Sequence, residues 1–389
     1  MKKIFIAFIL FLGGCKQQND ILNSENTTIS LNNDLIFEYA EDIKLKDIVK
    51  IENGELINPE LTLRTNKLGN IKINFQYKND LKQIKNYEFE IKVQDTTKPT
   101  IYISNLTTTK GKKIDILKKA MCGDNYDRNL TCKVEGNYDF NVVGEYPLKI
   151  VAIDSSGNET SEDFKLKVQE KTQTQTPQKS YYYLEDLIKV HKGENTMIGI
   201  DVSSWQGDID WQKVKNAGVE FAMIRIGYGQ DKNDKNIFDS KFKTNLKKAK
   251  ESGVLVGIYF YSYAKTKYDA LKQAKWIIEA LDGESLDLPI AFDWEIWSNF
   301  NSYKINFHDL NEIARTFIEE IENNGYQAMN YGSAFFMNRI WNIPEHETWL
   351  AHYTNKTSYT KPYYIWQLSN IGIVPGIDGY VDLDILYKK

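Results

Sequence analysis

Histidine and cysteine are scarce in this chain of 389 residues, which has four His and three Cys. No cysteine follows Cys132, and no Gly-x-Ser-x-Gly turn is present to expose a serine nucleophile. The histidines lack the His-Glu-x-x-His spacing of a zinc hydrolase; they are His191, His308, His346 and His352. These absences argue against serine, cysteine and zinc hydrolases. We expect no metal and no cofactor.

Strong charge and long apolar runs are also lacking. The net charge of −4 gives no basic stripe of the kind that nucleic-acid binding requires, so no nucleic-acid partner is expected. The one marked apolar run, Ile4 to Leu12, is too short for a membrane span of ~20 helical residues. Because it follows Met1-Lys2-Lys3, it is typical of a signal peptide.

The end of this run predicts a lipid anchor. Leu12-Gly13-Gly14-Cys15 resembles the bacterial lipoprotein box, in which the cysteine becomes the lipidated first residue. Residues 1–14 would then be removed, and polar residues 15–29 would form a tether. Two or more acyl chains anchor a protein stably. The predicted location is therefore the outer face of the cytoplasmic membrane, within the cell wall, with the membrane as a partner through Cys15.

Cys122 and Cys132 are the remaining cysteines, and export would place them in an oxidising compartment. We predict a disulfide between them, contributing roughly 2–3 kcal/mol on the chain-entropy estimate. Free thiols are the alternative. Two acids between these cysteines, Asp124 and Asp127, are interpreted as solvated turn residues rather than as a calcium site.

A repeat precedes the C-terminal half. Gly69 and Phe89 recur as Gly144 and Phe164, 75 residues later in both cases. Each unit contains alternating apolar and polar residues, as in half-buried strands. We predict two all-β sandwiches, residues 30–96 and 97–170, which resemble bacterial immunoglobulin-like modules. A polar linker, residues 171–195, follows them, and we expect the modules to act as spacers.

Residues 196–389 alternate between strand and helix patterns, which predicts an α/β barrel related to the TIM barrel. Its eight expected strands are 198–202, 221–226, 254–261, 289–295, 327–331, 348–353, 363–368 and 380–383. Its five expected helices are 211–216, 240–252, 268–281, 310–323 and 334–340. In such barrels the active site lies at the carboxyl ends of the strands.

Acidic residues stand at those strand ends. Asp201 closes the first strand, Asp293 and Glu295 close the fourth, and Asp382 lies on the eighth. Since alternate residues of a strand share a face, Asp293 and Glu295 should project together. Glycoside hydrolysis uses two carboxyl groups, or one acid with help from the substrate. Solvated acids, or acids paired with Arg225, are the structural alternative.

Aromatic residues also gather in this region, where all eight tryptophans lie between Trp205 and Trp366. Aromatic rings pack on the apolar faces of sugars, while their polar atoms bind hydroxyl groups. For any one ring, packing in the core is an equal alternative. The predicted substrate-binding residues are Tyr228, Tyr261, Trp294, Tyr331, Trp349, Trp366 and Gln367.

The motifs resemble glycoside hydrolase family 25, the N-acetylmuramidases. The resemblance runs in order from about residue 197. It rests on Gly199-Ile-Asp-Val-Ser-Ser-Trp-Gln-Gly207, Met223-Ile-Arg-Ile-Gly-Tyr-Gly229, Gly257-Ile-Tyr-Phe-Tyr-Ser262, Phe292-Asp-Trp-Glu295, Trp349-Leu-Ala-His-Tyr353, Tyr364-Ile-Trp-Gln367 and Gly379-Tyr-Val-Asp382. It implies a barrel with five helices that cleaves peptidoglycan between N-acetylmuramic acid and N-acetylglucosamine. It also implies that Glu295 is the catalytic acid, supported by Asp293, Asp201 and Asp382.

Two rival functions remain open. A chitinase-like enzyme would need a further acid two residues before Asp293, where Ala291 stands. A surface adhesin or glycan-binding pseudoenzyme suits the β modules but not the four retained acids. Oligomeric state is not indicated by the sequence.

Overall fold

The computed structural model describes residues 26–32, 34–171, 180–229 and 235–388. The chain divides into two compact units, the first ending at Thr97 and the second beginning at Lys98. The predicted signal peptide and Cys15 lie outside the described residues, as does most of the predicted tether. Among the helices that the structure describes, none is both long and apolar enough to cross a bilayer.

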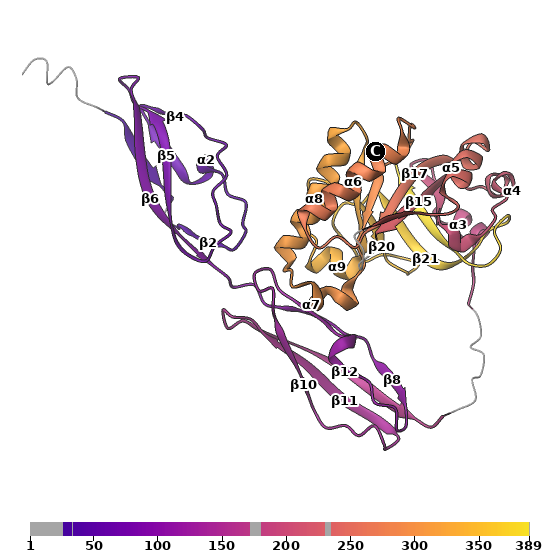
Figure 1. The fold of residues 1–389 in the computed structure, drawn as a ribbon. Coiled ribbons are helices and arrows are strands. Elements are labelled where there is room, and N and C mark those ends of the chain that lie inside the picture. Colours follow the sequence, from indigo (N-terminus) through magenta and orange to yellow (C-terminus); the bar gives the residue numbers. More distant parts are fainter. Residues whose placement is uncertain (1–25, 33, 172–179, 230–234, 389) are drawn as a thin grey trace, which may run out of the picture. The chain divides into compact units, whose positions relative to one another are not determined.

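The first unit is an all-β module built around the antiparallel pair β5 (Gly69–Lys78) and β6 (Ile84–Gln94) (Figure 1). Alternate side chains of this pair, including Phe75 and Ile91, are buried because a strand points successive residues to opposite faces. The sheets run β2-β6-β5-β4 and β1-β3. Their other elements are β1 (Thr28–Leu31), β2 (Ile36–Glu38), α2 (Leu45–Ile48), β3 (Val49–Glu52) and β4 (Glu55–Leu56).

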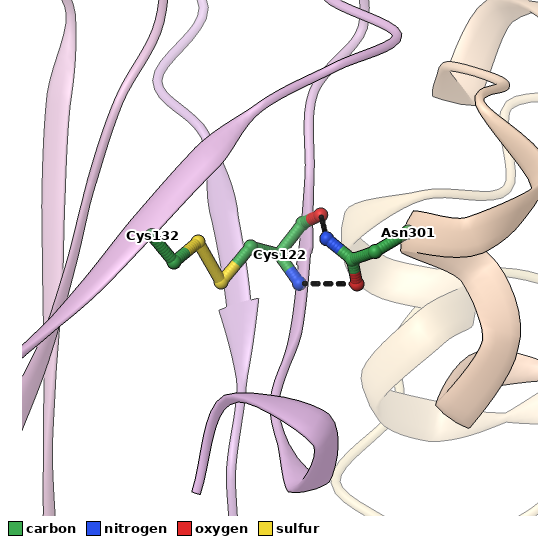
Figure 2. Close-up of a disulfide and its surroundings, with 3 residues drawn as sticks. All are labelled: Cys122, Cys132 and Asn301. Carbon is green, nitrogen blue, oxygen red and sulfur yellow. Dashed lines mark hydrogen bonds between the residues drawn. A yellow bond between two sulfur atoms is a disulfide. The ribbon is translucent and has the colours of Figure 1, made fainter. Parts of the chain in front are cut away.

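The second β module repeats this plan. Its long hairpin, β11 (Gly144–Ile153) and β12 (Glu159–Gln169), begins each strand 75 residues after β5 and β6. Two sheets run β10-β11-β12-β8 and β7-β9. They comprise β7 (Thr100–Tyr102), β8 (Leu106–Thr109), the short helix η1 (Leu117–Lys119), β9 (Met121–Gly123) and β10 (Thr131–Glu135). A disulfide between Cys122 of β9 and Cys132 of β10, the pairing expected from the sequence, ties the two sheets together (Figure 2).

The C-terminal domain is an eight-stranded barrel. Seven neighbouring strands run parallel, and β22 closes the ring by pairing antiparallel with both β21 and β14. The barrel strands are β14 (Thr196–Val202), β15 (Phe221–Gly229), β17 (Leu255–Tyr261), β18 (Ile290–Asp293), β19 (Ala328–Ser333), β20 (Glu347–Ala351), β21 (Ile365–Ile373) and β22 (Val381–Tyr387). Eight strands are therefore confirmed. The TIM-like sheet is corrected, because the antiparallel β22 makes the sheet mixed.

All five predicted helices are present. They are α4 (Trp211–Asn216), α5 (Phe242–Glu251), α6 (Lys267–Leu281), α8 (Phe307–Asn323) and α9 (Ala334–Arg339). Shorter elements are β13 (Tyr182–Tyr183), α3 (Leu184–His191), η2 (Ser204–Gln206), β16 (Asn236–Phe238), η3 (Trp297–Asn299) and α7 (Phe300–Tyr303). Capping boxes start the two longest helices, at Thr266 and Asn306.

The barrel has two apolar layers, one inside the ring and one between the ring and the helices. Strand alternation assigns each residue to one of them: Met223 and Tyr259 point inward, whereas Ile224 and Phe260 pack under the helices. Space inside is tight. A Cβ atom on Gly199 would lie 2.3 Å from the Phe221 ring, which explains a glycine two residues before Asp201.

Candidate active site

Four carboxyl groups lie toward one end of the barrel, on strands that the closure brings together. Asp201 on β14 stands directly opposite Asp382 on β22. Asp293 is the last residue of β18, and Asp384 follows Asp382 on the same face of β22. Glu295 differs from the sequence prediction, because β18 ends at Asp293 and leaves Glu295 two residues beyond the strand.

These carboxyl groups differ in their access to solvent. Asp201 and Asp293 are buried, with 6% and 5% of their surface exposed, and Asp384 has none exposed. Asp382 is half-buried and Glu295 is exposed. The site therefore has one exposed carboxyl group, Glu295, beside others that are buried in the fold.

Burial and neighbouring charges change the protonation of Asp293 and Glu295. Desolvation, and then the charge of Glu295, raise the pKa of Asp293 well above its usual value, and nearby Arg225 opposes the shift. Glu295 is open to solvent on one side, but the protein atoms crowded around it, together with the charge of Asp382, raise its pKa to about 7. The pair therefore retains a proton near neutrality, as a general acid requires.

A second group of acids surrounds Asp201. Desolvation, and then the charges of Asp382 and Asp384, raise the pKa of Asp201 well above its ordinary value. Burial likewise raises the pKa of Asp382 to about 6 and that of Asp384 to about 8. Asp384 accepts a hydrogen bond from Trp349 Nε1 at 2.9 Å. The sequence analysis did not propose Asp384, although its position two residues after Asp382 indicates the same strand face.

The pKa of Asp384 predicts how stability depends on pH. The folded state binds its proton more tightly than the unfolded chain, so stability falls as pH rises from about 4, the usual Asp range, through about 8. Asp384→Asn keeps an acceptor for Trp349 but cannot ionise. We expect its melting temperature to drop less than that of the wild type between pH 5 and pH 8.5. Equal drops would contradict this, and Asp163→Asn, at an exposed carboxylate, is the control.

Asp201 is held by a chain of hydrogen bonds. Gln367 Nε2 donates to Asp201 Oδ2 at 2.7 Å, while the hydroxyl groups of Tyr331 and Tyr353 both donate to Gln367 Oε1, at 2.9 and 3.1 Å. Gln367 therefore orients the Asp201 carboxyl group. Tyr353 was missed as a site residue, although it lies in a quoted motif and is 53% exposed.

Arg225 does not form an ion pair with the catalytic acids among the described residues. Its guanidinium group binds Asp239 Oδ2 through Nε at 2.8 Å and Nη2 at 2.7 Å, and it also donates to Ser204. The structural alternative, in which Arg225 neutralises Asp293 directly, is therefore wrong. Arg225 acts on Asp293 through its field, favouring the ionised carboxylate.

All three predicted sugar-binding tryptophans are corrected, because each is buried. Trp294 is the first residue after β18, and its fully buried ring belongs to the apolar layer under the helices, where Nε1 donates to Ala264 O. Trp366 precedes Gln367 on β21, so its side chain points to the opposite face, toward the helices, and its Nε1 donates to His352 O. Trp349 faces inward but is only 1% exposed, beneath the acids.

The tyrosines remain as candidates for contacting a sugar. Tyr228 and Tyr261 are partly exposed, and Tyr331 is buried with its hydroxyl group on Gln367. Burial, followed by the charges of Asp293 and Glu295, raises the pKa of Tyr261, so it stays a phenol beside the acid pair. Trp205, which was not selected from the sequence, is 85% exposed on the turn after β14.

Neighbouring carboxyl groups, one of them exposed and with a raised pKa, are the groups that glycoside hydrolysis uses. Residues 200–377 match the model of the glycosyl hydrolases family 25.

Several known proteins are similar to part of this chain. The uncharacterized protein YegX of Escherichia coli is 29% identical over 200 residues, covering 49% of this chain and 69% of YegX. The autolytic lysozyme of Clostridium acetobutylicum is 29% identical over 191 residues, 48% of this chain and 55% of its own length. A solved structure, the modular autolysin LytC of Streptococcus pneumoniae in complex with a synthetic peptidoglycan ligand, has a TM-score of 0.46 at 26% identity, covering 61% and 56% of the two chains.

Proposed function

We propose that this protein is a lysozyme that cleaves the β-1,4 bond between N-acetylmuramic acid and N-acetylglucosamine in peptidoglycan. The observation that carries the proposal is the pair formed by a buried Asp293 and an exposed, protonated Glu295. The family 25 match and the lysozyme relative support the same substrate. A glycan-binding pseudoenzyme would have no need of carboxyl groups whose pKa values are raised at strand ends.

The mechanism we propose retains the anomeric configuration with help from the substrate. Glu295 protonates the leaving oxygen, and the oxygen of the 2-acetamido group attacks the anomeric carbon. Asp293 orients and charge-stabilises that acetamido group. Water then attacks the anomeric carbon, the bond to the acetamido oxygen breaks, and Glu295 accepts the proton of that water. Asp201 and Asp382 hold the carboxyl cluster in place. The runner-up is direct attack by Asp293, which would form a glycosyl ester.

The pH dependence follows from the protonated form of Glu295. Its pKa of about 7 means that the acid is available below neutrality and is lost above it. We therefore expect kcat to fall as pH rises through about 7. Initial rates on a defined muropeptide oligomer between pH 5 and pH 9 measure this limb. A rate that climbs over that interval would contradict the assignment.

The product anomer tests the proposed function. NMR of a freshly digested muropeptide oligomer should show the β-anomer first, at a new reducing N-acetylmuramic acid end. Net inversion would reject both retaining schemes, and a glycosyl ester trapped on Asp293 would reject the substrate-assisted one. If no glycan bond is cut and cell-wall suspensions keep their turbidity, the protein is a glycan-binding pseudoenzyme and the proposed function is wrong.

We further propose that the protein is a lipoprotein whose β modules are immunoglobulin-like. The lipobox at Cys15 supports anchoring at the outer face of the cytoplasmic membrane. The repeated pair of small sheets supports the immunoglobulin-like assignment. Radiolabelled fatty acid should be incorporated into the wild type and not into a Cys15→Ser variant.

A further inference from the structure

The second β module packs against the barrel segment that follows Glu295. That segment comprises η3, α7 and the start of α8. The Asn301 side chain binds one backbone residue of the module twice: Oδ1 accepts from Cys122 N–H at 3.3 Å, and Nδ2 donates to Cys122 O at 2.7 Å (Figure 2). Two bonds from one planar amide fix both the position and the orientation of α7 relative to β9.

The start of α8 is held by the same module. Asn306, with no exposed surface, donates from Nδ2 to Tyr126 O at 2.7 Å, and Phe307 N–H donates to Asp124 O at 2.8 Å. First-turn amides have no partner within their own helix, so the module supplies one. The sequence analysis interpreted Asp124 as a solvated turn residue. That interpretation is wrong, because Asp124 is fully buried and accepts a hydrogen bond from Tyr126 N–H.

An ion pair and close apolar packing complete the contact. Arg128 binds both carboxylate oxygens of Asp309, at 2.6 and 2.8 Å. A Cβ atom on Gly123 would lie 2.4 Å from the Phe307 ring and 2.6 Å from that of Phe300, so the backbone of β9 lies directly on these rings. Because Arg128 is half-exposed, the ion pair orients the module against α8 but contributes little to the free energy of unfolding.

Aromatic rings connect this contact to Glu295. Trp297 stacks on Phe336 with ring centroids 3.7 Å apart, and it also meets Trp294 edge-on at 4.8 Å. Tyr102 of the module lies 5.3 Å from Phe336. Glu295, beyond the end of β18, therefore lies in a short stretch fixed at Trp294 and Trp297 rather than by strand pairing.

We infer that the second β module is a working part of the catalytic unit, and that it positions the Glu295 carboxyl group by holding Asn301 and the start of α8. The inference rests on the proposed role of Glu295. Asn301 is a positioning residue, because it acts through the segment and touches no substrate. The module is thus more than the spacer that the linker at 171–195 suggested.

Two alanine substitutions in the module of the full-length protein test this inference without changing any residue of the barrel. Gly123→Ala places a methyl group into Phe300 and Phe307, whereas Gly144→Ala, on β11, meets only Tyr146 at 3.7 Å and is the matched control. Neither glycine has a positive φ, so neither change strains its own backbone. Arg128→Ala is the milder second variant in case Gly123→Ala fails to fold.

We expect Gly123→Ala to lower kcat about tenfold or more with little change in KM, because small misplacements of a catalytic group are costly. A loosened segment would admit water around Glu295, so the alkaline limb should move to lower pH. Amide exchange over residues 296–303 should accelerate. Arg128→Ala should change all three in the same direction by less, and Gly144→Ala should match the wild type.

The inference is overturned if Gly123→Ala, or Arg128→Ala where the first is unfolded, keeps the kcat and the alkaline limb of Gly144→Ala. A lower melting temperature alone would show a merely structural contact and would also overturn it. Glu295→Gln, assayed in parallel, separates the proposed acid role of Glu295 from its positioning by the second β module. An active Glu295→Gln rejects the acid role itself, whereas an inactive one with an unaffected Gly123→Ala rejects only the positioning.

Discussion

Replacing Glu295 by Gln is expected to lower kcat by about 10³-fold, within the range of ~10²–10⁴ that general acid catalysis typically contributes. Gln has almost the same shape but cannot deliver a proton to the leaving oxygen. Glu295 is exposed, so the fold should be preserved. Rates on soluble muropeptide oligomers, with melting curves alongside, measure both effects.

The matched control for this change is Glu319→Gln, at an exposed position of α8. It should keep wild-type turnover. If Glu295→Gln retains more than half of the wild-type kcat, another group supplies the proton, and the half-buried Asp382 is the next candidate, since its pKa is raised to about 6.

Asp293→Asn is expected to lower kcat by roughly 10²–10³-fold, as is usual when a preorganised charge or dipole at the reacting centre is removed. The buried carboxylate is replaced by a neutral amide that still fits the site, so the positive charge that develops on the sugar loses its counter-charge. KM should change little, since the ground state carries no such charge.

Asp282→Asn is the control for the second change. Asp282 is an exposed C-cap of α6 in the left-handed conformation, which Asn also adopts readily. Its activity should be that of the wild type. Should Asp293→Asn instead lose only substrate affinity, with kcat intact, the carboxylate would be a binding group and not a stabiliser of the transition state.

Periodicity in the sequence was sufficient to predict the barrel. Each of the eight expected strands overlaps an observed one, and the expected helix 211–216 has the bounds of α4. The choice of aromatic residues ignored strand alternation. Trp366 and Gln367 are neighbours on β21, so their side chains point to opposite faces, and Trp294 next to Asp293 is likewise buried under the helices. The same alternation would have identified Asp384.

Other features could not be predicted because they depend on tertiary contacts between distant segments. Nothing near Asn301 in the sequence indicates that its amide will bind Cys122, 179 residues earlier. The buried turn at Asp124 is equally hidden, since a short polar stretch between two cysteines reads as solvated until a helix start is packed against it.

The antiparallel closure of the barrel affects when the enzyme becomes competent as it is made. Asp201 and Asp382 are direct neighbours across the β14–β22 seam, so the carboxyl cluster combines a residue at the start of the barrel with others near its end. A nascent chain that stops before β22 has Glu295 and Asp293 but lacks Asp382, Asp384 and the strand that closes the ring. We therefore expect translation products that lack β22 to be inactive, because they contain neither the closed ring nor the acids of its last strand.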